Sequence, residues 1–412
     1  MIPTVTLNPE RQLVHRITGA EGLVPRVPYV RASDWDTYCH CPFRYFLRRR
    51  LGLVRSFERS AALNYGSWFH VHAEETFQPP QVVDVQGRFA ARAAELKATA
   101  AVLDISLDKL RTVVETEERQ MLEAGAWWEA VKEVPIAQYG TAYDFLRQRS
   151  FRCLGTELGL RLRIAGLTGN RPFITACRLD MLLYNEEQNT LWIPDWKTCA
   201  EPTDIRLSTA PLEFQTWHYL KVVGLLLSKP ELIRKWGLKP DAKLGGMIHI
   251  AVQKPTISFG SKDRPFREET RALKSGPRKG QLTTERIYEG EPSYPNYIAR
   301  VKDWYLARGE YTHLASERLG IPPVNISFTK SAVLLDPKVD NWYHGILKRL
   351  ANASQCAAHL DQFPPSARHL REYGRLDQYA PFYDAPMEDW PRLADQLGFL
   401  VDPPDDTLDY LT

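Results

Sequence analysis

The sequence predicts a mixed α/β fold in which helices flank a central sheet. A helical hydrophobic pattern begins near residue 33, and three strand-like segments follow from residue 157, the first with strict apolar alternation. A second helical pattern covers residues 211–227, and another apolar strand covers residues 244–252. The predicted order of elements is therefore helix, three strands, helix and strand.

Helices are predicted throughout the first third of the chain. The first helix opens at Ser33, whose hydroxyl suits an N-cap, and it carries the large apolar residues Trp35, Tyr38, Phe43, Phe46 and Leu47. A second helix is predicted over residues 65–77. Residues 88–131 contain almost no Gly or Pro and repeat apolar residues at helical spacing, so we expect one or two long helices there, inserted before the strands.

The strands begin where the hydrophobic period changes. Apolar residues alternate over residues 157–165, a second strand covers 173–184, and a polar turn at 185–189 leads into a third strand over 190–196. Beyond Lys254 the chain is predicted to be rich in loops and then helical over residues 296–308 and 337–360.

Composition excludes several classes of protein. Hydrophobic residues make up 44% and charged residues 25%, which is too apolar for a disordered chain. No apolar run approaches the roughly 20 residues that cross a bilayer, and the N-terminus lacks the pattern of a secretory signal. Six scattered cysteines are too few for a disulfide scaffold. We expect a soluble, cytosolic protein of enzyme size.

The formal charge of +3 conceals an uneven distribution. Residues 402–412 carry four aspartates and no basic residue, so residues 1–401 carry +7. Residues 262–286 contain eight Lys or Arg against four Asp or Glu, and residues 48–50 are all arginine. Such clusters suit contacts to phosphate groups, although a solvated loop and the polar face of a helix explain them equally well.

The third strand ends in a pair of residues that can carry chemistry. Asp195 and Lys197 are two apart, so their side chains point to the same face of the strand. Alone this pair is a weak signal, because surface ion pairs produce it often. Asp180 strengthens it, since an acid in an apolar strand needs a compensating charge, which a divalent cation shared with Asp195 would supply. A strand-edge aspartate facing solvent is the ordinary alternative.

Two predicted helices carry polar side chains at matching spacing. His70 and Glu74 share one helical face, and Gln215 and Tyr219 share another. An amide beside a phenol suits contacts to phosphates or bases. The ordinary alternatives are a structural histidine and a partly buried hydrogen-bonding pair.

Together these motifs resemble the RecB-type branch of the PD-(D/E)XK nuclease superfamily, which includes phage exonucleases and the CRISPR-associated adaptation nucleases. Five segments match in the family's order over about residues 30–255: the helix from Ser33 to Arg44, Gly66-Ser67-x-x-His70, Asp180, Asp195-Trp196-Lys197-Thr198 and Gln215-x-x-x-Tyr219. Cys177 departs from the pattern, because the family usually has glycine there. The spacing from Gly66 favours His70 over His72 as the matching histidine.

The resemblance implies a restriction-endonuclease-like core of order αβββαβ, with a mixed central sheet flanked by helices, over residues 28–255. A helical insertion would span about residues 86–133 and serve as a DNA gate, a partner surface or scaffold. Residues 256–412 would form a C-terminal extension of helices and loops that packs back on the core and ends in the acidic tail 402–412.

The resemblance also implies a role for each matched residue. Asp180 and Asp195 would bind one or two Mg²⁺ or Mn²⁺ ions, with His70 as a nitrogen ligand. Lys197 would complete the catalytic set by orienting the attacking water and offsetting charge on the scissile phosphate. Gln215 and Tyr219 would position the DNA backbone.

Many members of this branch also hold a [4Fe–4S] cluster through one N-terminal cysteine and three near the C-terminus. Cys41 matches the first position, but the segment that resembles the cluster-binding tail, residues 363–384, contains no cysteine, and Cys356 is the sole cysteine after Cys199. Because such clusters need four thiolates, we predict no iron–sulfur cluster. Cys39 and Cys41 would then be buried thiols.

The implied activity is a metal-dependent deoxyribonuclease, an exonuclease rather than an endonuclease, in phage or mobile-element recombination and replication. Its location would be the cytoplasm, that of a bacterial host if a phage encodes it. DNA is the expected partner, a recombination or replication protein is a second candidate, and no membrane is expected. Two alternatives stay open: a CRISPR-adaptation-type nuclease that trims DNA, and a nuclease fold that binds DNA or a partner without cutting.

Overall fold

The computed structural model describes residues 29–54, 61–78, 84–102, 104–136, 139–148, 150–168, 171–200, 203–272, 275, 277, 281–314, 323–355, 371–372, 375–376 and 378–401. The predicted acidic tail 402–412, Cys356 and the segment 363–370 lie outside these residues.

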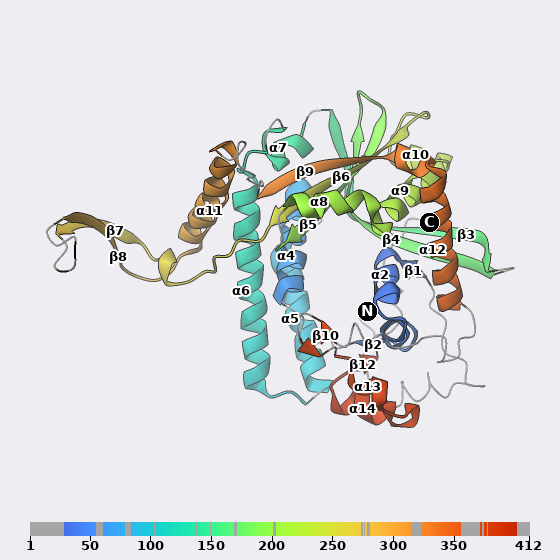
Figure 1. The fold of residues 1–412 in the computed structure, drawn as a ribbon, viewed down its shortest axis with the longest axis horizontal. Helices are drawn as coiled ribbons and strands as arrows, with labels where there is room; N and C mark the ends of the chain where they lie inside the picture. The colour runs from blue at the N-terminus through green and yellow to red at the C-terminus, as the bar shows by residue number, and fades with distance from the viewer. Residues whose placement is uncertain are drawn as a thin grey trace.

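Within the described residues, six strands form one mixed sheet (Figure 1). The strands are β1 (Val30–Arg31), β3 (Phe151–Thr168), β4 (Arg171–Asn185), β5 (Thr190–Cys199), β6 (Lys243–Gln253) and β9 (Val324–Lys330). Strand β4 is antiparallel to both of its neighbours in the chain, β3 and β5. Strand β6 is parallel to β5 and antiparallel to β9, and β1 is parallel to β4. The helix α9 (Phe214–Leu226) lies in the connection that a parallel β5–β6 pair requires.

Helices cover both faces of this sheet, as the predicted fold class requires. One face packs against α2 (Ala32–His40), α9, α10 (Pro230–Lys235) and α12 (Pro337–Gln355). The other packs against α4 (Ala61–Phe77), α6 (Leu107–Val131), α7 (Ala142–Leu146) and α11 (Tyr294–Leu314). The strands alternate accordingly, since Met247 of β6 joins the first core and its neighbour Ile248 joins the second. None of the described helices has both the length and the apolar character needed to cross a bilayer.

The long helical region expected over residues 88–131 consists of two helices, α5 (Val85–Val102) and α6. A short break separates them, and Ser106 begins α6 by accepting a hydrogen bond from the backbone N–H of Lys109 (3.4 Å). Helix α6 then packs against α4, where its Glu117 accepts hydrogen bonds from Asn64 and Trp68. The insertion thus supports the helix that carries His70.

The first predicted helix differs from the observed one at both ends. Ser33 is not the N-cap, because α2 begins at Ala32 and the carboxylate of Asp34 accepts the backbone N–H of Arg31 (2.8 Å). The helix also stops before Pro42, since the residue preceding a proline is pushed to extended geometry and Cys41 has φ −156° and ψ 107°. The chain continues as α3 (Pro42–Tyr45) and a π-helix (Phe46–Arg50).

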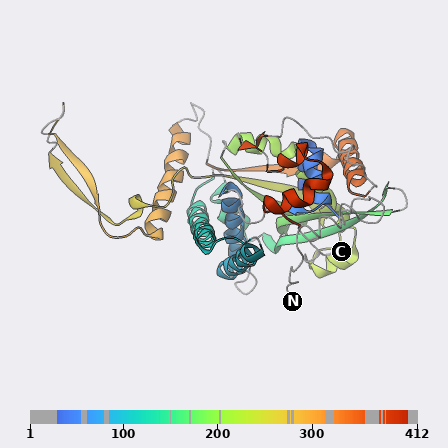
Figure 2. The same ribbon diagram turned by 90° about the horizontal axis from the view of Figure 1, so that it is seen from below.

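The region beyond Lys254 contains more strand than predicted. Strand β9 lies at the edge of the central sheet beside β6, although it is more than seventy residues further along the chain. Among the described residues, two further strands, β7 (Phe266–Ala272) and β8 (Leu282–Tyr288), pair only with each other. They form a hairpin, here called the arm, that extends away from the rest of the molecule (Figures 1 and 2).

The last part of the chain packs against the first. Tyr379, Phe382, Trp390 and Phe399 form a buried cluster with aromatic residues of α3 and the π-helix, among them Phe43. Strand β12 (Leu400–Val401) pairs with β2 (Leu53–Val54) at the same place. Two further aromatic residues of the segment that resembles the cluster-binding tail, Phe363 and Tyr373, lie outside the described residues.

Candidate active site

The site forms where the edge of β4 opens. Strand β3 pairs along β4 from Phe173 to Asn185 and so occupies one edge. The other edge is shared, because β1 pairs with residues 175–176 and β5 with residues 183–185. Between these points β5 separates from β4, and the register of the pair, if continued, would set Asp180 opposite Asp195. Across this gap the backbone N–H of Trp196 donates to Asp180 Oδ2 (2.8 Å).

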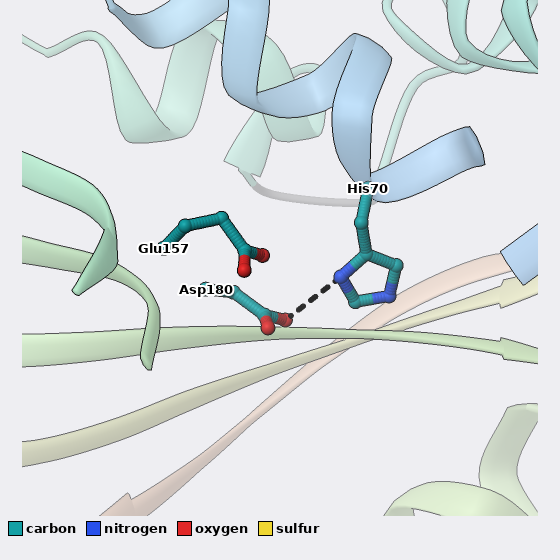
Figure 3. A group of neighbouring side chains, drawn as sticks. All are labelled: His70, Glu157 and Asp180. Atoms are coloured by element: carbon teal, nitrogen blue, oxygen red, sulfur yellow. Dashed lines mark ion pairs between the residues drawn. The ribbon is translucent and has the colours of Figure 1, made fainter. Parts of the chain in front are cut away.

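Three side chains converge at this opening: His70 from α4, Glu157 from β3 and Asp180 from β4 (Figure 3). Each offers one ligand atom, and these atoms lie within 4.8 Å of one another. His70 Nδ1 lies 3.3 Å from Asp180 Oδ2, and the two side chains are 25% and 18% exposed, so solvent reaches both. A nitrogen and hard carboxylate oxygens form a donor set that suits Mn²⁺ or Mg²⁺.

Close packing of α4 on the sheet brings His70 to this point. A Cβ at Gly66 would lie only 3.1 Å from Thr198 Oγ1 at the end of β5, so glycine permits the approach of helix and strand. One turn further along the helix, His70 faces Asp180. His72 points elsewhere, because its Nε2 lies 3.1 Å from the carbonyl oxygen of Met121 in α6. The contacts thus place His70, and not His72, beside Asp180.

Glu157 is the member of this group that the sequence analysis missed. It has φ +48°, a conformation that non-glycine residues seldom adopt, and it lies between the register pairs Thr156–Met181 and Leu158–Leu179, beside Asp180. Burial raises the pKa of Glu157, and the nearby carboxylates of Asp180 and Glu74 raise it further, to about 7. An acid among the alternating leucines of the first strand was the available signal.

A second group of polar residues surrounds Asp195 on the other side of the opening. Lys197 donates from Nζ to Asp195 Oδ1 (3.0 Å), so the two side chains share a face as predicted. Lys197 also donates to Gln215 Oε1 (3.3 Å), while Gln215 Nε2 donates to Tyr219 Oη (3.0 Å) and Asp195 Oδ1 (3.4 Å). The pair on α9 is thus joined to the pair on β5.

The charges in this second group stabilise one another. Burial raises the pKa of Asp195, but Lys197 and His249 lower it more strongly, so the net pKa lies well below its ordinary value. Burial lowers the pKa of Lys197, whereas Asp195 and Asp180 raise it, and the net change is upward. Burial also raises the pKa of Tyr219, so its phenol stays protonated and can donate a hydrogen bond. Asp195 and Lys197 are therefore both charged near neutral pH.

The pKa of His70 depends on charged residues from both groups. Burial lowers the pKa of His70, but the Asp180 carboxylate raises it more, and the Lys197 ammonium acts against that rise. Asp195 does not belong to the three-residue group around Asp180 among the described residues, and Lys197 holds it instead. The structure thus brings His70 to Asp180, and Gln215, Tyr219 and Lys197 to Asp195, with Trp196 between the groups.

The N-terminal cysteines correct one expectation. Cys41 is buried, with its sulfur 3.5 Å from Tyr383 Oη and accepting the backbone N–H of Arg44. Cys39 is exposed, contrary to the prediction of two buried thiols, because it lies on the solvent side of α2. None of the cysteines in the described part of the chain forms a disulfide bond.

Comparison with known proteins agrees with this geometry. A family model, the PD-(D/E)XK nuclease superfamily, matches residues 31–316, about two thirds of the chain. The match begins at β1 and includes both groups of polar residues at the opening. A search among curated proteins finds no match. The extent of the match shows that the chain belongs to the PD-(D/E)XK nuclease superfamily.

Proposed function

We propose that this protein is a metal-dependent DNA nuclease of the RecB-type branch, and that it degrades DNA from its ends in phage or mobile-element recombination or replication. The observation that carries the proposal is the convergence of His70, Glu157 and Asp180 beside the Asp195–Lys197 pair. Five motifs in the order of that branch add support. A nuclease site that had lost its activity would have no need to retain these acidic residues around Lys197.

The donor set defines where a cation would be held. His70, Glu157 and Asp180 offer one nitrogen and two carboxylates within reach of a single ion, and Asp195 lies across the same opening. A bound Mg²⁺ or Mn²⁺ would polarise the phosphate and lower the pKa of a coordinated water. The raised pKa of Glu157 fits this role, because crowded carboxylates gain from a cation between them.

The remaining residues act on the substrate. Lys197, held charged by Asp195, can orient the attacking water and stabilise negative charge that develops on the phosphate. Tyr219 accepts a hydrogen bond from Gln215 and keeps its own O–H available for a phosphate oxygen. Gln215 fixes the positions of both Lys197 and Tyr219. Together they would hold the scissile phosphate next to the carboxylates. Water would then attack the phosphate directly, without a covalent intermediate between enzyme and DNA.

Cleavage of labelled DNA tests this proposal. Purified protein with Mn²⁺ or Mg²⁺ should degrade linear duplex labelled at either end, while covalently closed circles should resist. Asp195→Ala and Lys197→Ala should lower the rate by about 100-fold or more, whereas Glu187→Gln, in an exposed turn, should not.

The same assay separates the alternatives. Cleavage of closed circles would favour an endonuclease, and trimming that stops at short overhangs would favour the adaptation-type nuclease. DNA binding without cleavage in either metal would show that the protein is a binding module and would overturn the proposal.

A further inference from the structure

Polar side chains from three elements surround Asp195, and two of them donate hydrogen bonds to it. Its side chain is 3% exposed, and its Oδ1 accepts from Lys197 (3.0 Å) and Gln215 (3.4 Å). Its other oxygen, Oδ2, faces His249 Nδ1 at 3.9 Å. This separation is longer than a hydrogen bond. Because the site is buried, His249 still faces this oxygen closely enough to interact with it electrostatically.

His249 occupies a position dictated by the sheet. In the parallel β5–β6 ladder it is the register partner of Asp195, so the two side chains share a face. His249 is 2% exposed, and its Nε2 lies 3.0 Å from Thr329 Oγ1 of β9, a residue that is 4% exposed. Three adjacent strands thus contribute a buried carboxylate, an imidazole and a hydroxyl in a row.

Folding alone gives no reason for this row. On the face of β6 that carries His249, the flanking residues Met247 and Ala251 are apolar and fully buried, and an aliphatic side chain at position 249 would bury without a polar cost. The carboxylate beside the ring favours the tautomer with a proton on Nδ1. Nε2 then accepts the Thr329 hydroxyl proton, and both ring nitrogens have a defined role.

We propose that His249 is a positioning residue that orients Asp195 for metal binding through its Nδ1–H, with Thr329 fixing the ring. This inference rests on the proposed function, because it assigns Asp195 a metal. The arrangement is comparable to outer-shell hydrogen bonds in metalloproteins, whose loss typically weakens metal binding by about 10- to 100-fold.

A pair of substitutions separates the two ring nitrogens. The side-chain amide of His249→Asn can lie near the original Nδ1 and keeps a donor toward Asp195. The longer His249→Gln places its amide near the original Nε2, so it keeps the contact to Thr329 and loses the donor. Direct Mn²⁺ binding, followed by electron paramagnetic resonance, is the readout, with Asp195→Asn setting the size of a full loss.

We expect His249→Gln to weaken Mn²⁺ binding by about tenfold and His249→Asn to stay within about threefold of wild type. Binding equal to wild type in both, equal losses in both, or a larger loss in His249→Asn would overturn the inference. If either variant fails to fold, Thr329→Val takes its place, and unchanged Mn²⁺ binding there would also overturn it. If wild type binds Mn²⁺ but cleaves no DNA, the proposed function fails while this comparison still decides the role of His249.

Discussion

Glu157 keeps a backbone conformation that costs free energy, and it does so beside another acid. Its φ of +48° and the proximity of Asp180 are both unfavourable in the protein without a cation. A strained backbone conformation and a pair of repelling carboxylates are retained at sites where function requires them. A positively charged ligand at this point would account for both features.

The substitution Glu157→Gln should therefore change stability and metal binding in opposite directions. A carboxyl whose pKa rises from about 4.5 in the unfolded chain to about 7 in the folded protein destabilises the fold as pH rises through this range. In the presence of a chelator, the variant should unfold at a higher temperature than wild type at pH 8, with little difference at pH 4.5. Its Mn²⁺ affinity should fall by about tenfold.

Thermal unfolding at the two pH values and Mn²⁺ titration check this. Glu187→Gln, an exposed glutamate in the turn after β4, is the matched control for loss of one carboxylate. Lower stability of Glu157→Gln at pH 8, or unchanged Mn²⁺ binding, would contradict the assigned role.

At the scale of elements, the spacing between α4 and β5 sets the position of His70. Because a Cβ at Gly66 would lie 3.1 Å from Thr198 Oγ1, Gly66→Ala should push the helix away from the strand by a few tenths of an ångström. Small displacements of a ligand reduce catalysis strongly, so we expect about a tenfold loss of cleavage rate. Thr198→Ala removes the obstructing atom, and the double variant should recover. Lack of recovery would show that the loss does not come from this contact.

On the sheet face that packs against α9, a buried histidine of this helix links it to three other elements. His218 of α9 donates from Nε2 toward Thr175 of β4 (3.0 Å), which in turn donates to Val30 of β1, and its Nδ1 accepts from Tyr343 of α12 (3.2 Å). Each nitrogen of the neutral ring is used. Burial lowers the pKa of His218 from 6.5 to about 4.

This network predicts a pH-dependent stability. The unfolded chain binds a proton at His218 as pH falls below 6.5, but the folded protein does not until about pH 4, so stability is complete above 6.5 and falls below it. The total loss is about 3 kcal/mol. Denaturant unfolding of wild type and His218→Gln from pH 7 to 4 measures it, with exposed His344→Gln as control. Parallel stability curves for wild type and His218→Gln would refute this.

The strands nearest the site were predictable because their signals are local. A short polar turn between two apolar strands implies antiparallel pairing, and residues 180 and 195 are equally distant from its centre, so their meeting follows from the register. Glu157 and His249 were not predictable in this way. Their proximity depends on the pairing of β3 with β4 and on a crossover that makes β6 parallel to β5. Strand β9 was missed because its pairing partner lies far away in the sequence.

At the scale of the molecule, the basic segment 262–286 has a different form from the solvated loop considered at first. Its described strands form the arm, and cross-strand or end pairs neutralise three of its arginines: Arg271 with Glu285, Arg286 with Glu268 and Arg267 with Glu289. The base of the arm is held by Asp263, which is fully buried and accepts two hydrogen bonds of 2.8 Å from Arg300. The arm is thus anchored to the body at its base.

Removing the arm should leave the body folded. Because β7 and β8 pair with no other strand in the part of the chain that the structure describes, replacing residues 266–288 by a short Gly-Ser linker should keep the unfolding temperature within about 2 °C of wild type. Asp263→Ala should instead destabilise the protein by on the order of 3 kcal/mol, since it leaves Arg300 without its buried partner. Calorimetry distinguishes the two, and a large loss of stability on removal of the arm would contradict this anchoring.

The proposed function requires the side chains at the opening of the β4 edge to hydrolyse DNA with a divalent cation. Release of label from linear duplex by wild type and Asp180→Asn, in Mn²⁺ and then with excess chelator, tests it most directly. Wild type should release label only while Mn²⁺ is available, and Asp180→Asn should be at least about 100-fold slower while still binding DNA. Release that continues in chelator, or an Asp180→Asn variant as fast as wild type, would contradict it.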